Sequence, residues 1–144
     1  MIEIKQLNEV TPEVVSAFTR LLAQLSPDCQ VLEIERFQKI VNNESVYGFG
    51  AHNPAIIGTL TLALISTPSG TKAWIEDVVV DISVRKQGVG KQLIQYGIDF
   101  AKELKVASVN LTSRAERVAA NELYKEMGFI LRETNVYRLV INPA

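Results

Sequence analysis

Hydrophobic residues along the chain switch between two spacings, and each switch predicts a change of secondary structure. Alternating or uniformly apolar runs predict strands, whereas apolar residues three or four positions apart predict one face of a helix. Strands are expected at 2–7, 45–52, 55–66, 73–80, 106–112 and 129–141, and helices at 12–25, 31–41, 88–104 and 115–127. The pattern therefore predicts an α+β domain, with a mixed sheet of six or seven strands flanked by about four helices.

Residues that favour turns and helix ends separate these segments. Thr11-Pro12 supplies a helix cap followed by a proline at the first helical position. Asn53-Pro54 separates the two strands of a predicted antiparallel hairpin. Gly128 fits the position that follows the C-terminus of the last helix. The long helix links strand 73–80 to strand 106–112 as a β-loop-α-β crossover.

The charged residues nearly balance, with 15 Lys and Arg, 16 Asp and Glu, and a net charge of -1. Such a chain has no overall basic field to bind nucleic acid or an anionic membrane. The single cysteine, Cys29, and the single histidine, His52, exclude an intrachain disulfide and a multi-His or Cys/His metal site. No apolar stretch reaches the roughly 20 residues of a membrane helix, and the N-terminus does not resemble a secretory signal. We expect one metal-free, cytoplasmic domain over 1–144.

Two adjacent carboxylates, Glu76 and Asp77, lie in the middle of the strongly apolar strand 73–80. Successive strand residues point to opposite faces of a sheet. One of the two carboxylates must therefore face inward unless a β-bulge intervenes.

The loop between this strand and the long helix has the composition of a phosphate site. Gly88 and Gly90 let the backbone approach a ligand closely, and the first N–H groups of the helix lack intrahelical partners. Arg85, Lys86 and Lys91 add three cations with no acid among them. A di- or triphosphate is the ligand that this pattern favours. The alternative is a tight turn with a solvated basic helix start.

Two well-known phosphate loops do not fit. A Walker loop needs Ser or Thr after Gly-Lys and a glycine five positions before the second glycine, where Gln92 and Arg85 stand. The dinucleotide fingerprint fails because its third glycine position is Leu93.

The remaining pattern, Arg-x-x-Gly-x-Gly at Arg85, Gly88 and Gly90, resembles the acetyl-CoA pyrophosphate motif of the GCN5-related N-acetyltransferase (GNAT) superfamily. The segment Ala-Ala-Asn-Glu-Leu-Tyr-Lys-Glu-Met-Gly-Phe at 119–129 is similar to the C-terminal motif of the same superfamily. The stretch 74–80 is also similar to the corresponding strand of glucosamine-phosphate acetyltransferases. The resemblance implies a three-layer fold around a mostly antiparallel, twisted sheet. It also implies transfer of acetyl from acetyl-CoA directly to a primary amine through a tetrahedral intermediate, without a metal.

The resemblance assigns roles to particular residues. In this superfamily the strand before the glycine loop and the strand after the long helix splay apart around the pantetheine arm. The implied cofactor-binding residues are Val78, Val79 and Val80 along that arm, Arg85, Lys86, Gln87, Gly88, Val89, Gly90 and Lys91 around the pyrophosphate, and Asn121 and Tyr124 in the C-terminal motif. A main-chain N–H near Val79 would polarise the thioester carbonyl.

Three side chains are candidates for the proton transfers. Tyr124 matches the tyrosine that donates a proton or a hydrogen bond to the CoA sulfur, and the alternative is an aromatic ring packed in the core. Glu76 is the first candidate for the general base, directly or through water, and Asp77 is the second. The alternative is that one of these carboxylates is a solvated strand residue and the other pairs with a nearby cation. Some members of the superfamily have no dedicated base.

Several questions stay open at the level of sequence. A non-catalytic acyl-CoA-binding or sensing domain is the alternative to an enzyme. The acceptor is an amino-sugar phosphate, another small amine, or a protein N-terminus or lysine. Ser113, Arg114 and Arg117 either contact CoA or cap the last helix, and capping or solvation is favoured. His52 is interpreted as a turn residue. Homodimers are common in this superfamily, so a second copy of the chain is a candidate partner.

Overall fold

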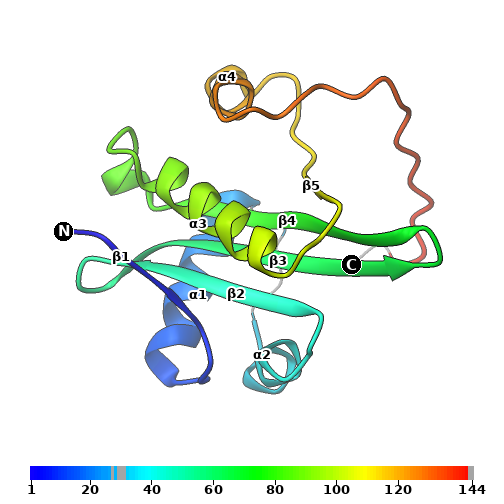
Figure 1. The fold of residues 1–144 in the computed structure, drawn as a ribbon. Helices are drawn as coiled ribbons and strands as arrows, with labels where there is room; N and C mark the ends of the chain where they lie inside the picture. The colour runs from blue at the N-terminus through cyan, green and yellow to red at the C-terminus, as the bar shows by residue number, and fades with distance from the viewer. Residues whose placement is uncertain (27, 29–31, 143–144) are drawn as a thin grey trace. The chain divides into compact units, whose positions relative to one another are not determined.

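A computed structural model describes residues 1–26, 28 and 32–142 (Figure 1). The elements are β1 (Glu3–Gln6), α1 (Pro12–Leu25), α2 (Ile34–Val41), β2 (Val46–His52), β3 (Ile56–Thr67), β4 (Gly70–Val80), the short 3-10 helix η1 (Ile82–Val84), α3 (Val89–Glu103), β5 (Ser108–Asn110) and α4 (Val118–Glu126). They form two compact units, one over Met1–Leu111 and one from Thr112 onward. A single domain over 1–144 stays a prediction. The loop residue Cys29 lies outside the described residues.

The first unit is built on one sheet with the strand order β1-β2-β3-β4-β5. Neighbouring strands are antiparallel from β1 to β4, and the β4–β5 pair is parallel. The predicted hairpin and crossover are therefore confirmed, as is the mixed, mostly antiparallel sheet. The strand count was wrong, because the described residues form five paired strands instead of six or seven.

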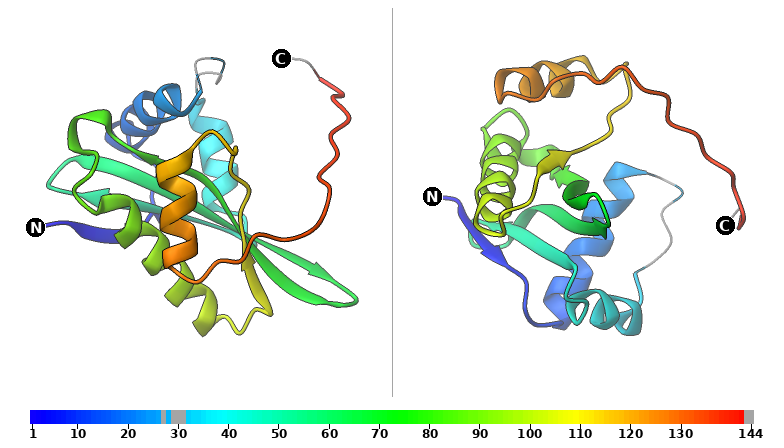
Figure 2. Two further views of the ribbon diagram at one scale, coloured as in Figure 1. Left: turned by 90° about the horizontal axis from the view of Figure 1, so that it is seen from above. Right: turned by 45° about the vertical axis from the view of Figure 1, so that its right-hand side comes forward.

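Helices cover both faces of this sheet (Figure 1; Figure 2, right). On one face, α1 buries Leu21 against Ile56 and Val79 of the sheet. On the other face, α3 packs over the central strands, where the rings of Tyr96 and Phe100 contact Phe49 of β2 with centroids 5.3 and 5.1 Å apart. The buried residues of α3, Val89, Leu93, Ile94, Gly97 and Ala101, recur three or four positions apart, as the sequence pattern predicted for this helix. The sheet and the helices on its two faces give the first unit three layers.

The start of α1 follows the predicted capping pattern. The Thr11 side-chain oxygen accepts a hydrogen bond from the Val14 N–H at 3.2 Å, and Pro12 is the first helical residue. Both features stabilise a helix start, because the cap satisfies an otherwise free N–H and proline has none to satisfy at that position.

A β-bulge interrupts β4 in its middle. Thr61 lies opposite Glu76 and Thr59 lies opposite Val79, so β4 has one residue more than β3 across this interval. Asp77 takes up the extra length with a φ of 52°. The bulge reverses the alternation of β4. Val79 consequently packs on the α1 face with Leu21, although Ile75, opposite Leu62, lies on the α3 face.

The second unit contains α4 and the C-terminal segment. The helix ends in a Schellman motif, in which Gly128 has a φ of 101°, its N–H bonds the Lys125 carbonyl, and the Phe129 N–H bonds the Tyr124 carbonyl. This confirms the predicted role of Gly128. In the described chain, no helix has the length and apolar character needed to cross a membrane.

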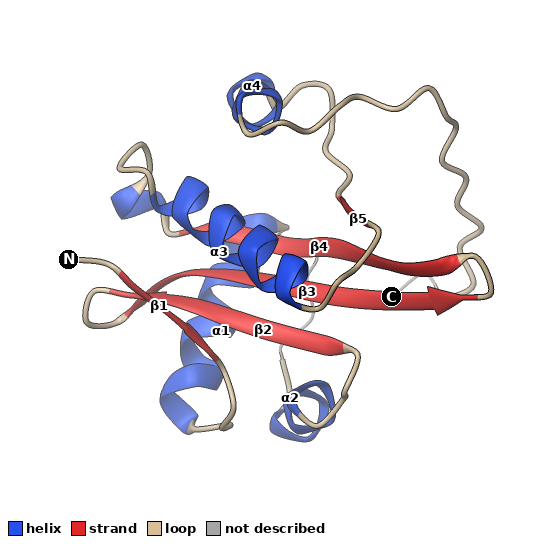
Figure 3. Ribbon diagram, viewed as in Figure 1, coloured by secondary structure: helices blue, strands red, loops and turns tan. Residues whose placement is uncertain are grey.

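The predicted last strand over 129–141 was wrong. Figure 3 draws the segment after α4 as loop, and residues 130–142 take part in no strand pairing. Its large apolar residues are exposed: Ile130, Leu131, Val136, Tyr137, Leu139, Val140 and Ile141. An apolar pattern defines which face of a strand is buried, but a strand also needs a hydrogen-bonded neighbour. Residues 129–141 have the apolar pattern of a strand but pair with no described strand.

Candidate active site

The loop between β4 and α3 presents free backbone N–H groups at a helix start. Gly88 caps α3 with φ 81° and ψ 7°, a left-handed conformation that glycine adopts without strain. A Cβ at this position would meet no atom within 4 Å, so the space beside it is open. Among the described residues, the N–H groups of 87–91 find no hydrogen-bond acceptor. This is the arrangement that binds phosphate at helix N-termini.

The three predicted cations surround this helix start. Arg85, Lys86 and Lys91 are all exposed. The Arg85 Nε donates a hydrogen bond to the Val80 carbonyl at 3.3 Å, which holds the guanidinium back along the end of β4. Lys86 has a φ of 65°, a left-handed conformation that is costly for a residue with a Cβ. Strained residues of this kind are common at ligand sites.

The end of β4 next to this loop has a free edge. The pairing between β4 and β5 covers only Lys72–Trp74 and Ser108–Asn110, so the β4 segment from Ile75 to Val80 has no described strand beside it on that edge. The Asp81 N–H donates a hydrogen bond to the Ile57 carbonyl of β3, whereas the Val80 carbonyl accepts one from the Arg85 side chain. Since backbone groups alternate along a strand, the N–H and C=O of Val80 and of Val78 point to the free edge.

The two carboxylates of β4 are both exposed, because the bulge at Asp77 removes the need for one to face inward. Desolvation, and then the neighbouring negative charge of Asp77, raise the pKa of Glu76. Partial desolvation raises the pKa of Asp77 as well. A raised pKa brings a carboxylate closer to the value useful in a general base near neutral pH. No set of three His, Cys, Asp or Glu side chains suitable for a metal occurs within the described ranges.

The remaining predicted site residues belong to the second unit. Tyr124 is buried in α4 with 8% of its surface exposed, and its ring contacts Phe129 edge-on with centroids 6.0 Å apart. The Asn121 amide nitrogen donates to the Arg114 and Arg117 carbonyls at 2.9 and 2.7 Å. Asn121 therefore closes the turn before α4, and its amide nitrogen is already engaged.

The residues before α4 do not cap it with their side chains. Arg114 and Arg117 are exposed, and Arg117 is the N-cap residue without a side-chain hydrogen bond. The Ser113 hydroxyl is buried and has no hydrogen-bond partner in the described part of the chain. In the first unit, His52 ends β2 in the hairpin, as predicted, and burial lowers its pKa.

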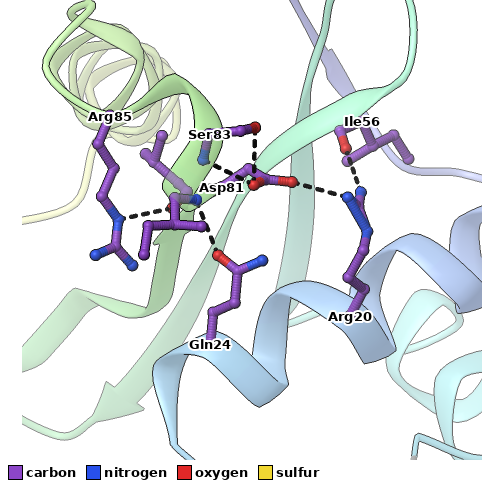
Figure 4. A network of polar contacts seen from close by, with 8 residues as sticks. Arg20, Gln24, Ile56, Asp81, Ser83 and Arg85 are labelled. Atoms are coloured by element: carbon purple, nitrogen blue, oxygen red, sulfur yellow. Dashed lines mark hydrogen bonds and ion pairs between the residues drawn. The ribbon is translucent and has the colours of Figure 1, made fainter.

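Sequence reasoning missed a polar network behind the loop (Figure 4). The Asp81 carboxylate accepts hydrogen bonds from Arg20 of α1 at 2.8 Å and from the N–H and hydroxyl of Ser83 at 3.1 and 3.0 Å. These partners, with the Ser83 N–H first, lower the pKa of Asp81. The pattern Asp-x-Ser at the loop start is a local signal for the capping bonds. No local signal points to Arg20, which lies 61 residues away.

Comparisons with known proteins identify the family of the chain. The sequence model of the acetyltransferase (GNAT) family matches residues 10–129. A Bacillus subtilis (strain 168) protein named "Uncharacterized N-acetyltransferase YhdJ" is 30% identical over 143 residues, covering 96% of this chain and 98% of that protein.

Solved acetyltransferase structures have the same fold. An aminoglycoside acetyltransferase, meta-AAC0020, from an uncultured soil metagenomic sample and in complex with sisomicin superposes with a TM-score of 0.85 at 23% identity, covering 98% of this chain and 96% of that one. Aminoglycoside N-acetyltransferase AAC(6')-Iy in complex with CoA superposes with a TM-score of 0.78 at 18% identity, covering 97% and 95%. With the family match across most of its length, the chain belongs to the acetyltransferase (GNAT) family and is an acetyltransferase.

Proposed function

We propose that this acetyltransferase takes its acetyl group from acetyl-CoA and transfers it directly to a primary amine. The observation that carries the proposal is the start of α3, where free N–H groups, the left-handed Gly88 and the exposed Arg85, Lys86 and Lys91 adjoin the free edge of β4. N–H donors and cations at a helix start suit a pyrophosphate. An unpaired strand edge suits the amide groups of a pantetheine arm.

The main-chain atoms of β4 would stabilise the reacting carbonyl. Of the groups near Val79, the N–H groups of Val78 and Val80 point to the free edge and are the candidates for this bond. A fixed N–H donor lowers the barrier because negative charge develops on the thioester oxygen as the amine attacks the carbonyl carbon. The backbone N–H groups of residues 87–91 would hold the pyrophosphate at the other end of the cofactor.

Side chains would complete the proton transfers. Glu76, or Asp77 in its place, takes a proton from the amine nitrogen as the new C–N bond forms, directly or through a water molecule. The C–S bond then breaks, and Tyr124 donates its phenolic proton to the departing thiolate. Solvent returns a proton to the tyrosine and takes one from the carboxylate, so the enzyme is restored.

The acceptor that we propose is a small cationic amine. The exposed carboxylates of Glu76 and Asp77 favour a positively charged molecule and disfavour one that brings a phosphate to the same place. Sisomicin, the molecule bound in the structurally similar meta-AAC0020 complex, fits this description. An amino-sugar phosphate and a peptide lysine or N-terminus are the competing acceptors.

The test combines the purified chain with acetyl-CoA and a panel of amines. The panel contains an aminoglycoside, a polyamine, an amino-sugar phosphate and a lysine peptide, and free thiol and acetylated product are both measured. We expect thiol release and acetylation with the cationic small amines. Binding of CoA without thiol release on any amine would instead support a sensing domain. Turnover only with the sugar phosphate or the peptide would contradict the proposed acceptor class.

A further inference from the structure

The residues that anchor the loop before α3 come from α1, far away in the sequence. Arg20 uses two nitrogens, one for the Asp81 carboxylate at 2.8 Å and one for the Ile56 carbonyl at 3.0 Å. Gln24, one turn further along the same face of α1, accepts the Ile82 N–H at 3.0 Å. Figure 4 shows both side chains reaching from α1 to the end of β4 and the first turn after it.

The contacts from α1 fix Asp81 and Ile82, which lie just before the glycine loop. Asp81 is 8% exposed, its N–H bonds Ile57 at 2.8 Å, and its carbonyl accepts the Val84 N–H at 3.0 Å. Beyond Val84, no described backbone N–H donates to a backbone carbonyl until Gln92, which bonds Gly88. The direction in which the chain leaves the turn at Asp81 therefore sets where the cations and N–H groups of the loop lie.

We infer that Arg20 and Gln24 are positioning residues for the pyrophosphate loop and act through Asp81 and Ile82. The inference rests on the proposed use of acetyl-CoA. Fixed donors bind an anion well only when their own support is rigid, since a loop that must be ordered on binding loses affinity. The guanidinium suits this task because its planar fork serves a carboxylate and a carbonyl at once, which a lysine ammonium does less well.

The experiment measures CoA affinity by calorimetry for the wild type and for Arg20→Gln, Arg20→Lys and Asp81→Asn. Asp81→Asn keeps the side-chain size and an acceptor for Ser83 while it removes the charge that pairs with Arg20. Arg36→Gln is the matched control, because Arg36 is an exposed arginine on α2. We expect Kd for CoA to rise at least about tenfold for Arg20→Gln and Asp81→Asn. The Kd for CoA should rise by less in Arg20→Lys, and Arg36→Gln should bind CoA as the wild type does.

A second measurement separates positioning from a general loss of stability. Acetyl-pantetheine carries the same thioester without the pyrophosphate. If the network positions the loop, kcat/KM falls for acetyl-CoA but is unchanged for acetyl-pantetheine in the same variant. Equal losses on both thioesters, or unchanged CoA affinity in variants with intact thermal transitions, would overturn the inference. Absence of CoA binding in the wild type would overturn the proposed donor instead, so the two failures are distinguishable.

Discussion

Substitution of Gly88 separates the ligand role of the loop from a purely structural role. Gly88 has a φ of 81°, and a Cβ there would contact nothing within 4 Å. Gly88→Ala therefore introduces backbone strain without a clash. The left-handed conformation costs a residue with a Cβ about 1–2 kcal/mol, and asparagine tolerates it much better than alanine. We expect the free energy of unfolding to fall by that amount in Gly88→Ala and by less in Gly88→Asn.

The expected change in melting temperature follows from the size of the chain. For a protein near this length, 1 kcal/mol shifts Tm by about 2–4 °C, so Gly88→Ala should melt roughly 2–8 °C below the wild type. Gly88→Asn should melt nearer to the wild type. Its side chain enters the open space where we propose the pyrophosphate, so Kd for CoA should rise at least about tenfold. The assays are thermal unfolding and calorimetric titration with CoA.

Gly97→Ala is the control for these two variants. Gly97 lies inside α3 without a left-handed backbone, and its Cβ would be 3.4 Å from the Leu60 side chain. Because alanine favours helices more than glycine does, we expect Gly97→Ala to retain stability and CoA affinity. If Gly88→Asn folds normally and binds CoA as the wild type does, the open space beside Gly88 is not the pyrophosphate site. If Gly88→Ala does not lower Tm, the left-handed conformation is wrong.

Four further substitutions test the strain and the chemistry. Lys105 follows α3 with a φ of 58°, so Lys105→Gly should raise Tm by about 2–4 °C, and a lower Tm in thermal unfolding would contradict this. Lys86→Gly relieves the same strain but removes a cation, so we expect a higher Tm in thermal unfolding and a higher, less salt-dependent Kd for CoA by calorimetry. A variant with a higher Tm that binds CoA as tightly as the wild type, or more tightly, would contradict the proposed role of Lys86. The acidic limb of the kcat–pH profile should lie above the ordinary glutamate value of about 4.3, because desolvation and Asp77 raise the pKa of Glu76, and the limb should disappear in Glu76→Gln. A limb that survives removes Glu76 from the mechanism. Tyr124→Phe should lower kcat about 100-fold with Kd for CoA unchanged, and unchanged turnover would exclude the proton donor.

Local patterns were sufficient to predict most of the fold. The capped start of α1, the Asn53-Pro54 hairpin, α3 and the end of α4 at Gly128 all depend on residues within a few positions of each other. The glycine loop and its cations were predictable for the same reason. Each of these features is specified by short-range sterics or hydrogen bonding, which a sequence displays directly.

Features that depend on distant partners were not predictable. The bulge at Asp77 results from the register of β4 against β3, and the Arg20–Asp81 pair needs the packing of α1 on the sheet. The apolar pattern over 129–141 predicted a strand because it could not show whether a neighbouring strand edge is present. Which residues face the acceptor likewise depends on packing between segments that carry no motif.

Because of the bulge, the number of residues in β4 matters more for the fold than the identity of the residues at the bulge. Deleting one residue at Asp77 would restore simple alternation and turn every later position of β4 to the opposite face of the sheet. Val79 would leave its partners on α1, and the carboxylate at position 81 would point away from Arg20. Substitution of Glu76, or of Asp77 by asparagine or glycine, which adopt a left-handed backbone readily, would leave this geometry in place. We therefore expect that the fold tolerates such changes of identity at these two positions better than a change in their number.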